Sequence, residues 1–216
     1  CQPCSLYERG RGYVPPVGPT TAPLLFVGES AGSDEAYRGE PFVGAAGSML
    51  QRLFNLLGWR REDQRIDNVC RCQPLENWLD GAPWERSATE HCSRVHLSQT
   101  LAEPHKVVVT LGNIAMRNVL GLEKSKGCSV QNFHGCVVAD PRDQSGSRLV
   151  VPTYHPSFLQ RGATNLIGTV LWDLQQAQQA ITAGVPPPTH SLIIDSPPDW
   201  FSAWVDQVIA ARQQDP

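Results

Sequence analysis

The sequence lacks any apolar run long enough to cross a membrane, and its charge is not biased toward one sign. The longest uninterrupted apolar stretches, such as the valines at 107–109, fall far short of the ~20 residues a spanning helix requires. No basic segment followed by an apolar run precedes the first cluster of Gly and Pro, so we expect no secretion signal. The 18 Lys and Arg against 21 Asp and Glu give a net charge of −3, which confines any nucleic-acid contact to a local groove.

The composition is that of a folded α/β domain. Apolar residues make up 41% of the 216 residues, which is enough for a real core and excludes disorder as the main state. Pro is as common as Gly, at 18 each, and this indicates long ordered loops. The chain begins at Cys1 rather than Met, so we expect it to be a piece of a longer polypeptide.

Four short apolar segments indicate strands, and amphipathic segments between them indicate helices. The alternation predicts a three-layer α/β/α sandwich around a central four-stranded parallel sheet. Functional residues of such sheets gather beyond the carboxyl ends of the strands. Polar sequence follows three of the strands, at 28–32, at Asn68 and at His155. The predicted strands are 24–27, 65–69, 106–111 and 148–152, the predicted helices are 48–57, 89–101, 113–120 and 164–183, and 121–148 is a loop or hairpin.

The sequence predicts three segments: a domain at 1–183, a Pro-rich linker at 184–191 and a tail at 192–216. The tail pattern is one strand and one helix, which cannot form a core of their own. We therefore expect the tail either to pack on the domain or to begin a following domain.

Seven cysteines in a chain without a secretion signal favour a metal or cluster site over a disulfide framework. Cys1 and Cys4 have the two-residue spacing of a chelating pair, and Cys72 and Cys92 could complete a tetrahedral thiolate site. Zinc and iron–sulfur clusters share these ligands, and buried small hydrophobic residues are the alternative.

The segment 28–47 holds five glycines, a density that lets the backbone approach a ligand closely. It has no GxGxxG pattern, which argues against a dinucleotide fingerprint. Phe42 within this polar loop is suited to be a flat platform for a planar ring, or else an anchor of the loop in the core.

Five blocks together resemble the iron–sulfur uracil-DNA glycosylases of family 4, in register from residue 1 to about 180. The blocks are Gly28-Glu-Ser-Ala-Gly, Gly39-x-Pro-Phe-Val-Gly-x-Ala-Gly, Asn68-Val-x-x-Cys72-x-Pro74, Val109-Thr-Leu-Gly112 and His155-Pro-Ser-Phe-Leu. The resemblance implies the α/β/α sandwich, a 4Fe-4S cluster on Cys1, Cys4, Cys72 and Cys92, and excision of uracil from single- or double-stranded DNA.

The resemblance also implies roles for individual residues. Phe42 matches the base-stacking aromatic, Asn68 the uracil-reading amide and His155 the catalytic imidazole. The acidic residues of the family's first motif, one of which positions water, fall on Glu29 and Glu35. Glycines that shape the pocket fall on Gly28 and Gly47.

The sequence departs from the family at the first block, which is usually Gly-Glu-Ala-Pro-Gly. Ser30 and Ala31 stand there instead, and the Ser30 hydroxyl could hold water or change the base preference. The Cys72–Cys92 interval is also longer than usual, with Trp78 and Trp84 in it. Two alternatives therefore stay open: a glycosylase for another base, such as hypoxanthine or a modified cytosine, and a non-catalytic module that binds uracil or DNA.

The tail resembles the entry to the proofreading exonuclease domain of a DNA polymerase, so we predict a glycosylase–polymerase fusion. We expect a monomer that binds DNA and not membranes. Its expected location is the cytoplasm, in association with the nucleoid, of a prokaryote or in a phage-like setting.

Overall fold

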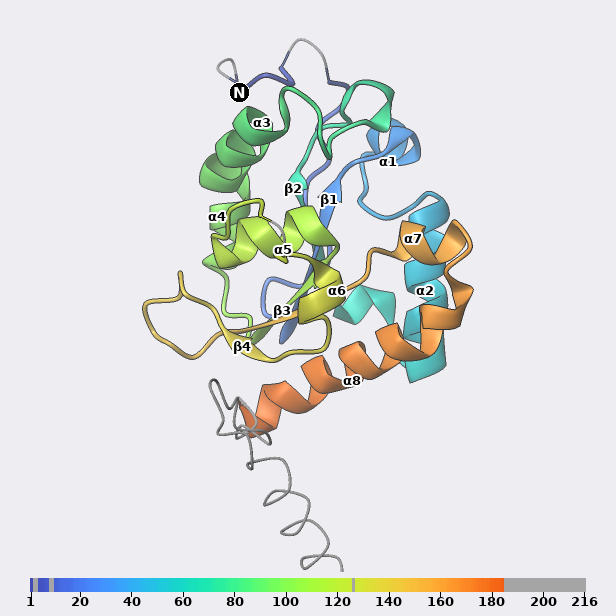
Figure 1. Cartoon of the computed structure of the whole chain (residues 1–216), viewed down its shortest axis with the longest axis vertical. Helices are drawn as coiled ribbons and strands as arrows, with labels where there is room; N and C mark the ends of the chain where they lie inside the picture. Colours follow the sequence, from blue (N-terminus) through green and yellow to red (C-terminus); the bar gives the residue numbers. More distant parts are fainter. Residues whose placement is uncertain (2–3, 8–9, 126, 185–216) are drawn as a thin grey trace, which may run out of the picture. The chain divides into compact units, whose positions relative to one another are not determined.

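A five-stranded sheet forms the centre of the protein in the computed structural model, which describes residues 1, 4–7, 10–125 and 127–184 (Figure 1). The strand order is β2-β1-β3-β5-β4. The first four of these strands are parallel, which confirms the predicted sheet, while β4 pairs antiparallel with β5. The strands are β1 Leu24–Ser30, β2 Arg65–Cys70, β3 Val107–Leu111, β4 Val138–Ala139 and β5 Leu149–Thr153.

The strand β4 corrects the predicted count of four strands. It has only two residues, so no alternating pattern marks it in the sequence. It lies within the segment 121–148, where a loop or hairpin was expected, and it forms a hairpin with β5.

All four predicted helices are confirmed. The segment 89–101 forms a longer helical run made of α3, a π-helix at Ser93–Leu97 and α4. Three helices of four to six residues were not predicted, because so short a segment carries no helical periodicity. The helices are α1 Ser33–Arg38, α2 Ala45–Leu57, α3 Glu85–Cys92, α4 Ser98–Leu101, α5 Asn113–Leu120, α6 Val130–Phe133, α7 Pro156–Gln160 and α8 Ile167–Ala183. Short 3-10 turns lie at Arg61–Asp63, Leu75–Asn77 and Thr164–Leu166.

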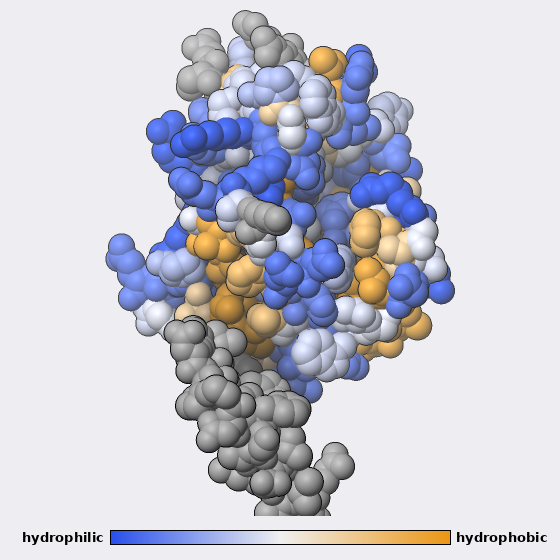
Figure 2. Space-filling view, in the orientation of Figure 1, coloured by the Kyte–Doolittle hydropathy of each residue, from blue (hydrophilic) through white to orange (hydrophobic). Residues whose placement is uncertain are grey.

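Successive side chains of a strand point to opposite faces of the sheet, and helices cover both faces, which gives three layers. In β1, Leu25 and Val27 enter a core shared with α3 and α5, whereas Leu24 and Phe26 enter a second core shared with α2 and α8. Figure 1 shows α3 and α4 on one side of β1 and β2, with α2 and α7 on the other. Hydrophilic residues cover much of the face shown in Figure 2, and hydrophobic residues reach the surface around α7.

The register of the sheet brings the polar strand ends together. Gly28 in β1 is the Cα partner of Asn68 in β2, and Leu111 in β3 is the partner of Thr153 in β5. Since these strands are parallel, their carboxyl ends share one edge, and His155 follows Thr153 at that edge.

No helix in the described ranges is both long and apolar enough to span a bilayer. The predicted tail at 192–216 and all of the predicted linker except Gly184 lie outside the described residues, so both stay predictions.

Candidate active site

A cavity of about 620 Å³ lies at the carboxyl edge of the sheet. Its walls come from the segments that follow β1, β2, β3 and β5, as parallel-sheet topology leads one to expect. The structure brings six of the predicted site residues together in its lining: Glu29, Ser30, Glu35, Phe42, Asn68 and His155.

Gly28 lies behind this lining and allows its close packing. A Cβ atom at Gly28 would lie 2.3 Å from Oδ1 of Asn68 and 2.5 Å from the Phe42 ring. A Cβ at Gly47 would lie 1.8 Å from the backbone oxygen of Phe42. Both glycines are therefore required for Phe42 and Asn68 to occupy these positions.

The Phe42 ring forms a wall of the cavity. Its backbone has φ 54°, in the left-handed region that side chains rarely adopt. Such strain persists only where the surroundings fix it, and it gathers at ligand sites. The ring centroid lies 5.7 Å from that of His155, with 32° between the planes.

The Oδ1 atom of Asn68 is buried and has no hydrogen-bond partner among the described residues. The backbone N–H of Asn68 donates to Oδ1 of the neighbouring Asp67 at 2.8 Å. Asp67 is itself paired with Arg71, at 2.8 Å between Oδ2 and Nη2, and accepts from the Thr100 hydroxyl at 2.7 Å. A buried, fully bonded network thus fixes the backbone of Asn68, while its amide oxygen is left for a ligand.

The hydrogen bonds of His155 determine its tautomer. The backbone N–H of Ser157 donates to Nδ1 of His155 at 3.2 Å. Because an N–H can only donate, Nδ1 is the acceptor, and the proton of the neutral ring is on Nε2. Burial, together with the charge of Arg161, lowers the pKa of His155 to about 4, so the ring is neutral at physiological pH.

Glu29, the last residue but one of β1, lines the cavity and has an unusual pKa. Burial raises the pKa of its carboxyl to about 7, and the negative charges of Asp80 and Glu85 add to this effect. Arg117 and Arg161 act in the opposite direction. A carboxyl that titrates near neutral pH is suited to accept a proton from water.

Glu35 has a different environment, although it also lines the cavity. One carboxylate oxygen accepts the backbone N–H groups of Val43 and Gly44, at 3.0 and 2.8 Å, and the other accepts that of Gly32 at 3.0 Å. These bonds tie α1 to the loop that carries Phe42. Glu35 therefore braces this loop, and its oxygens are already engaged.

Sequence reasoning missed several residues of the cavity wall. Trp78 and Asp80 line it from the segment between β2 and α3, and Tyr154, Phe158 and Arg161 line it around α7. The Tyr154 and Phe158 rings stack at 5.8 Å with 14° between their planes. In the sequence, only the position of Phe158 directly after His-Pro-Ser indicates that this aromatic pair lies at the site.

Four thiols lie near the C-terminal end of α3 and form the thiol region, those of Cys4, Cys70, Cys72 and Cys92. Cys4, Cys70 and Cys92 pack in one core cluster, and burial raises the pKa of the nearby Cys72 thiol to about 11. A hydrogen bond from the Cys70 thiol lowers the pKa of Cys92 to about 7. Strand β2 ends at Cys70, and the Cys70 thiol contacts that of Cys92.

The donor chemistry of this thiol region suits an iron–sulfur cluster, which takes thiolate ligands. In the described part of the chain, however, no three Cys, His, Asp or Glu side chains are arranged as a finished metal site. The Sγ atom of Cys1 lies 3.1 Å from Nε2 of His96, which is on the π-helix one turn after Cys92.

Comparison with known proteins agrees with this geometry. Residues 15–181 match the family model of the uracil DNA glycosylase superfamily. The chain is 37% identical to the type-4 uracil-DNA glycosylase of Archaeoglobus fulgidus, over 73% of this chain and 76% of that protein. It is 35% identical to the type-4 enzyme of Thermotoga maritima, over 84% and 89% of the two chains. It is 32% identical to that of Saccharolobus solfataricus, over 73% and 71%. The chain therefore belongs to the type-4 uracil-DNA glycosylases.

Proposed function

We propose that this glycosylase recognises uracil in DNA through Asn68 and Phe42 and releases it with the help of His155 and Glu29. The observation that carries the proposal is the buried, unpartnered Oδ1 of Asn68 beside the Phe42 ring. This oxygen can accept N3–H of uracil, and the amide nitrogen can donate to O4. Cytosine presents the opposite pattern at both atoms, so it would leave buried polar groups unpaired.

The target base reaches these groups only after it leaves the duplex or when the strand is single. Flipping a paired base costs a few kcal/mol, which the pocket must offset. Phe42 would stack on the face of the base, with its strained backbone already in place.

His155 would stabilise the leaving group. Cleavage of the glycosidic bond leaves negative charge on O2 of uracil, and the Nε2–H of the neutral ring can donate to it. Because Ser157 fixes the tautomer beforehand, little reorganisation is needed when the charge develops.

Glu29 is the residue that we propose for positioning and activating water. Its carboxyl lines the cavity, and its pKa of about 7 suits a general base. Glu35, the other candidate, is occupied by three backbone N–H groups and holds the Phe42 loop.

Cys1, Cys4, Cys72 and Cys92 would hold the 4Fe-4S cluster, with zinc as the alternative metal. When bound, the cluster would supply iron–thiolate bonds that tie the N-terminal segment to β2 and α3. The test is direct, since an iron–sulfur protein is brown and contains iron and acid-labile sulfide. A colourless protein with one equivalent of zinc would contradict the cluster.

The activity test uses oligonucleotides that contain one uracil, single-stranded or paired with guanine or adenine. After incubation, alkali cleaves the strand at abasic sites, and the products are separated by length. We expect cleavage at uracil and none in a matched oligonucleotide with thymine or cytosine. A second substrate with hypoxanthine tests the effect of Ser30, which lines the cavity. Cleavage at hypoxanthine but not at uracil would contradict the proposal.

A further inference from the structure

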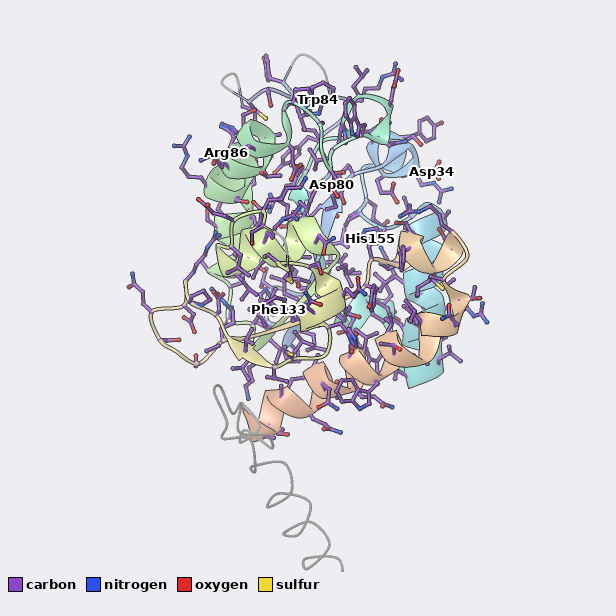
Figure 3. All side chains as sticks on the ribbon, in the orientation of Figure 1. Asp34, Asp80, Trp84, Arg86, Phe133 and His155 are labelled. Carbon is purple, nitrogen blue, oxygen red and sulfur yellow. The ribbon has the colours of Figure 1, made fainter. Side chains whose placement is uncertain are left out.

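An exposed tryptophan stands at the mouth of the cavity on a segment that the proposed chemistry does not use. Trp78 lies between β2 and α3, and 48% of its surface is exposed. With Asn77 and Asp80, it lines the same cavity as His155. Figure 3 shows Asp80 on this segment, on the side toward His155, with Trp84 farther away.

The backbone before Trp78 is held in a strained shape. Glu76 and Asn77 have φ 54° and 57°, and the only other non-glycine residue with positive φ in the described ranges is Phe42. The side chain of Gln73 donates to that of Asn77 at 3.0 Å, and the backbone N–H of Trp78 donates to the oxygen of Leu75 at 3.0 Å. Both non-glycine turns with positive φ in the part of the chain that the structure describes therefore present an aromatic ring to one cavity.

The Trp78 ring itself is fixed from one side. Its Nε1–H donates to the backbone oxygen of Asp80 at 3.0 Å, and its ring meets that of Trp84 edge to face at 5.4 Å. The Asp80 carboxylate in turn pairs with Lys124 at 2.8 Å. A large apolar surface thus stays exposed although its position is already determined, as in preorganised contact residues.

The cavity offers few charges with which to hold DNA. Among its described lining residues, Arg161 is the only arginine or lysine, whereas Phe42, Trp78, Tyr154 and Phe158 are aromatic. Its volume of about 620 Å³ is in the range that holds ligands larger than one pyrimidine. Contacts to nucleotides beside the uracil must then come mainly from stacking, which serves any base.

We infer that Trp78 forms a second base subsite, in which it stacks on the nucleobase next to the flipped uracil in a single strand. A neighbouring base in a duplex stays stacked and paired, so its face is covered, whereas in a single strand it can turn onto the indole ring. The inference rests on the proposed function, because it requires uracil in the Phe42–Asn68 pocket.

Binding to an uncleavable substrate tests the subsite. The probe is a fluorescent single-stranded oligonucleotide with one 2′-fluoro-2′-deoxyuridine, and fluorescence anisotropy gives Kd. We expect Trp78→Ala to raise Kd about tenfold, the loss expected for one base–aromatic stack, and Trp78→Phe to retain most of the affinity. The matched control is Leu75→Ala, since Leu75 is 51% exposed on the same segment but does not line the cavity.

A double-mutant cycle identifies the base that is contacted. Each neighbour of the uridine is replaced in turn by an abasic tetrahydrofuran nucleotide. One of the two replacements should weaken binding by the wild type about tenfold and leave binding by Trp78→Ala unchanged. In the cleavage reaction, Trp78→Ala should raise KM for single strands more than for duplexes and leave kcat near the wild-type value.

Three results would overturn the subsite. The first is an unchanged Kd for Trp78→Ala, and the second is that each abasic replacement weakens binding by the wild type and by Trp78→Ala to the same extent. The third is a fall in kcat of Trp78→Ala without a change in KM. The last result would mean that Trp78 shapes the uracil pocket. Failure of the proposed function is recognised separately, because the wild type would then not prefer the fluorouridine strand to a matched thymidine strand.

Discussion

The cavity and the thiol region differ in how far contacts within the chain alone hold their side chains in a binding geometry. In the cavity, the tautomer of His155, the backbone of Asn68 and the loop of Phe42 are each fixed by hydrogen bonds within the chain. In the thiol region, four sulfurs lie near one another, yet no three side chains of the described residues have the geometry of a metal site. Cys1 contacts His96 rather than the other thiols.

The proposed roles of the two regions account for this contrast. A transient substrate is bound best by groups that are already in position, whereas the proposed cluster would complete its own site as the chain folds around it. The two regions share strand β2, which carries Asn68 and ends at Cys70. Arg71 links them, since it pairs with Asp67 and its backbone N–H donates to the Cys92 sulfur. Substitutions in the cavity should thus change the reaction, and those at the thiols should change stability.

The largest effect is expected for Glu29→Gln. Removal of the carboxylate should lower kcat for uracil release about 10²–10⁴-fold, the usual loss of a general base. In the wild type, kcat/KM should rise with pH through about 7, the pKa of Glu29, and this limb should be absent from the residual activity of the variant. Glu35→Gln is the comparison, and its effect should include a lower melting temperature, because it weakens the brace of the Phe42 loop.

Glu29→Gln should also stabilise the protein at alkaline pH. The pKa of Glu29 is raised from its ordinary value of 4.5 to about 7 in the folded state, so folding takes up a proton between these two pH values. The stability that the protonated Glu29 carboxyl contributes is fully present below pH 4.5 and is lost as the pH rises through 7. Glu29→Gln should therefore melt higher than the wild type at about pH 8 and equally at about pH 4. Equal melting at both pH values would show that Glu29 is not desolvated.

A somewhat smaller effect is expected for His155→Ala. The loss of one positioned donor to the leaving group should lower kcat about 10²–10³-fold while binding of uracil DNA is mostly kept. Because the pKa of His155 is about 4, the ring stays neutral across the working range, and the limb near pH 7 should persist in this variant. Full activity of the variant would contradict the role of His155 at O2.

Asn68→Asp tests the reading of the base. A carboxylate would put two acceptors together at O4 of uracil, so excision should fall about 10–100-fold at neutral pH. A protonated acid could instead accept a cytosine, and activity on cytosine-containing strands should then increase as the pH falls. Unchanged preference for uracil at every pH would show that another group reads the base.

The smallest effect on the reaction is expected at the thiol region. Cys72→Ser should lower the melting temperature and the iron content, while the ratio of activity on uracil to that on cytosine stays unchanged. Cys136→Ser is the matched control, since Cys136 is exposed and lies outside the thiol region. A shift in base preference in Cys72→Ser would end the separation between the two regions.

The sequence by itself determined the sheet, the main helices and the residue types of the site. Strands β1, β2, β3 and β5 are short buried runs with polar residues after them, and the length of α8 makes its periodicity plain. The elements that it did not reveal, α1, α6, α7 and β4, are too short to show a period.

Only the tertiary structure decided how the chosen residues work. Glu29 and Glu35 are equivalent in the sequence, but the backbone groups around Glu35 and the burial of Glu29 give them different roles. The place of Trp78 on the cavity also depends on the fold, because contacts across the sheet edge join segments far apart in the chain. Residue types and spacing record local chemistry, whereas pKa values, tautomers and shared cavities arise only when distant segments meet.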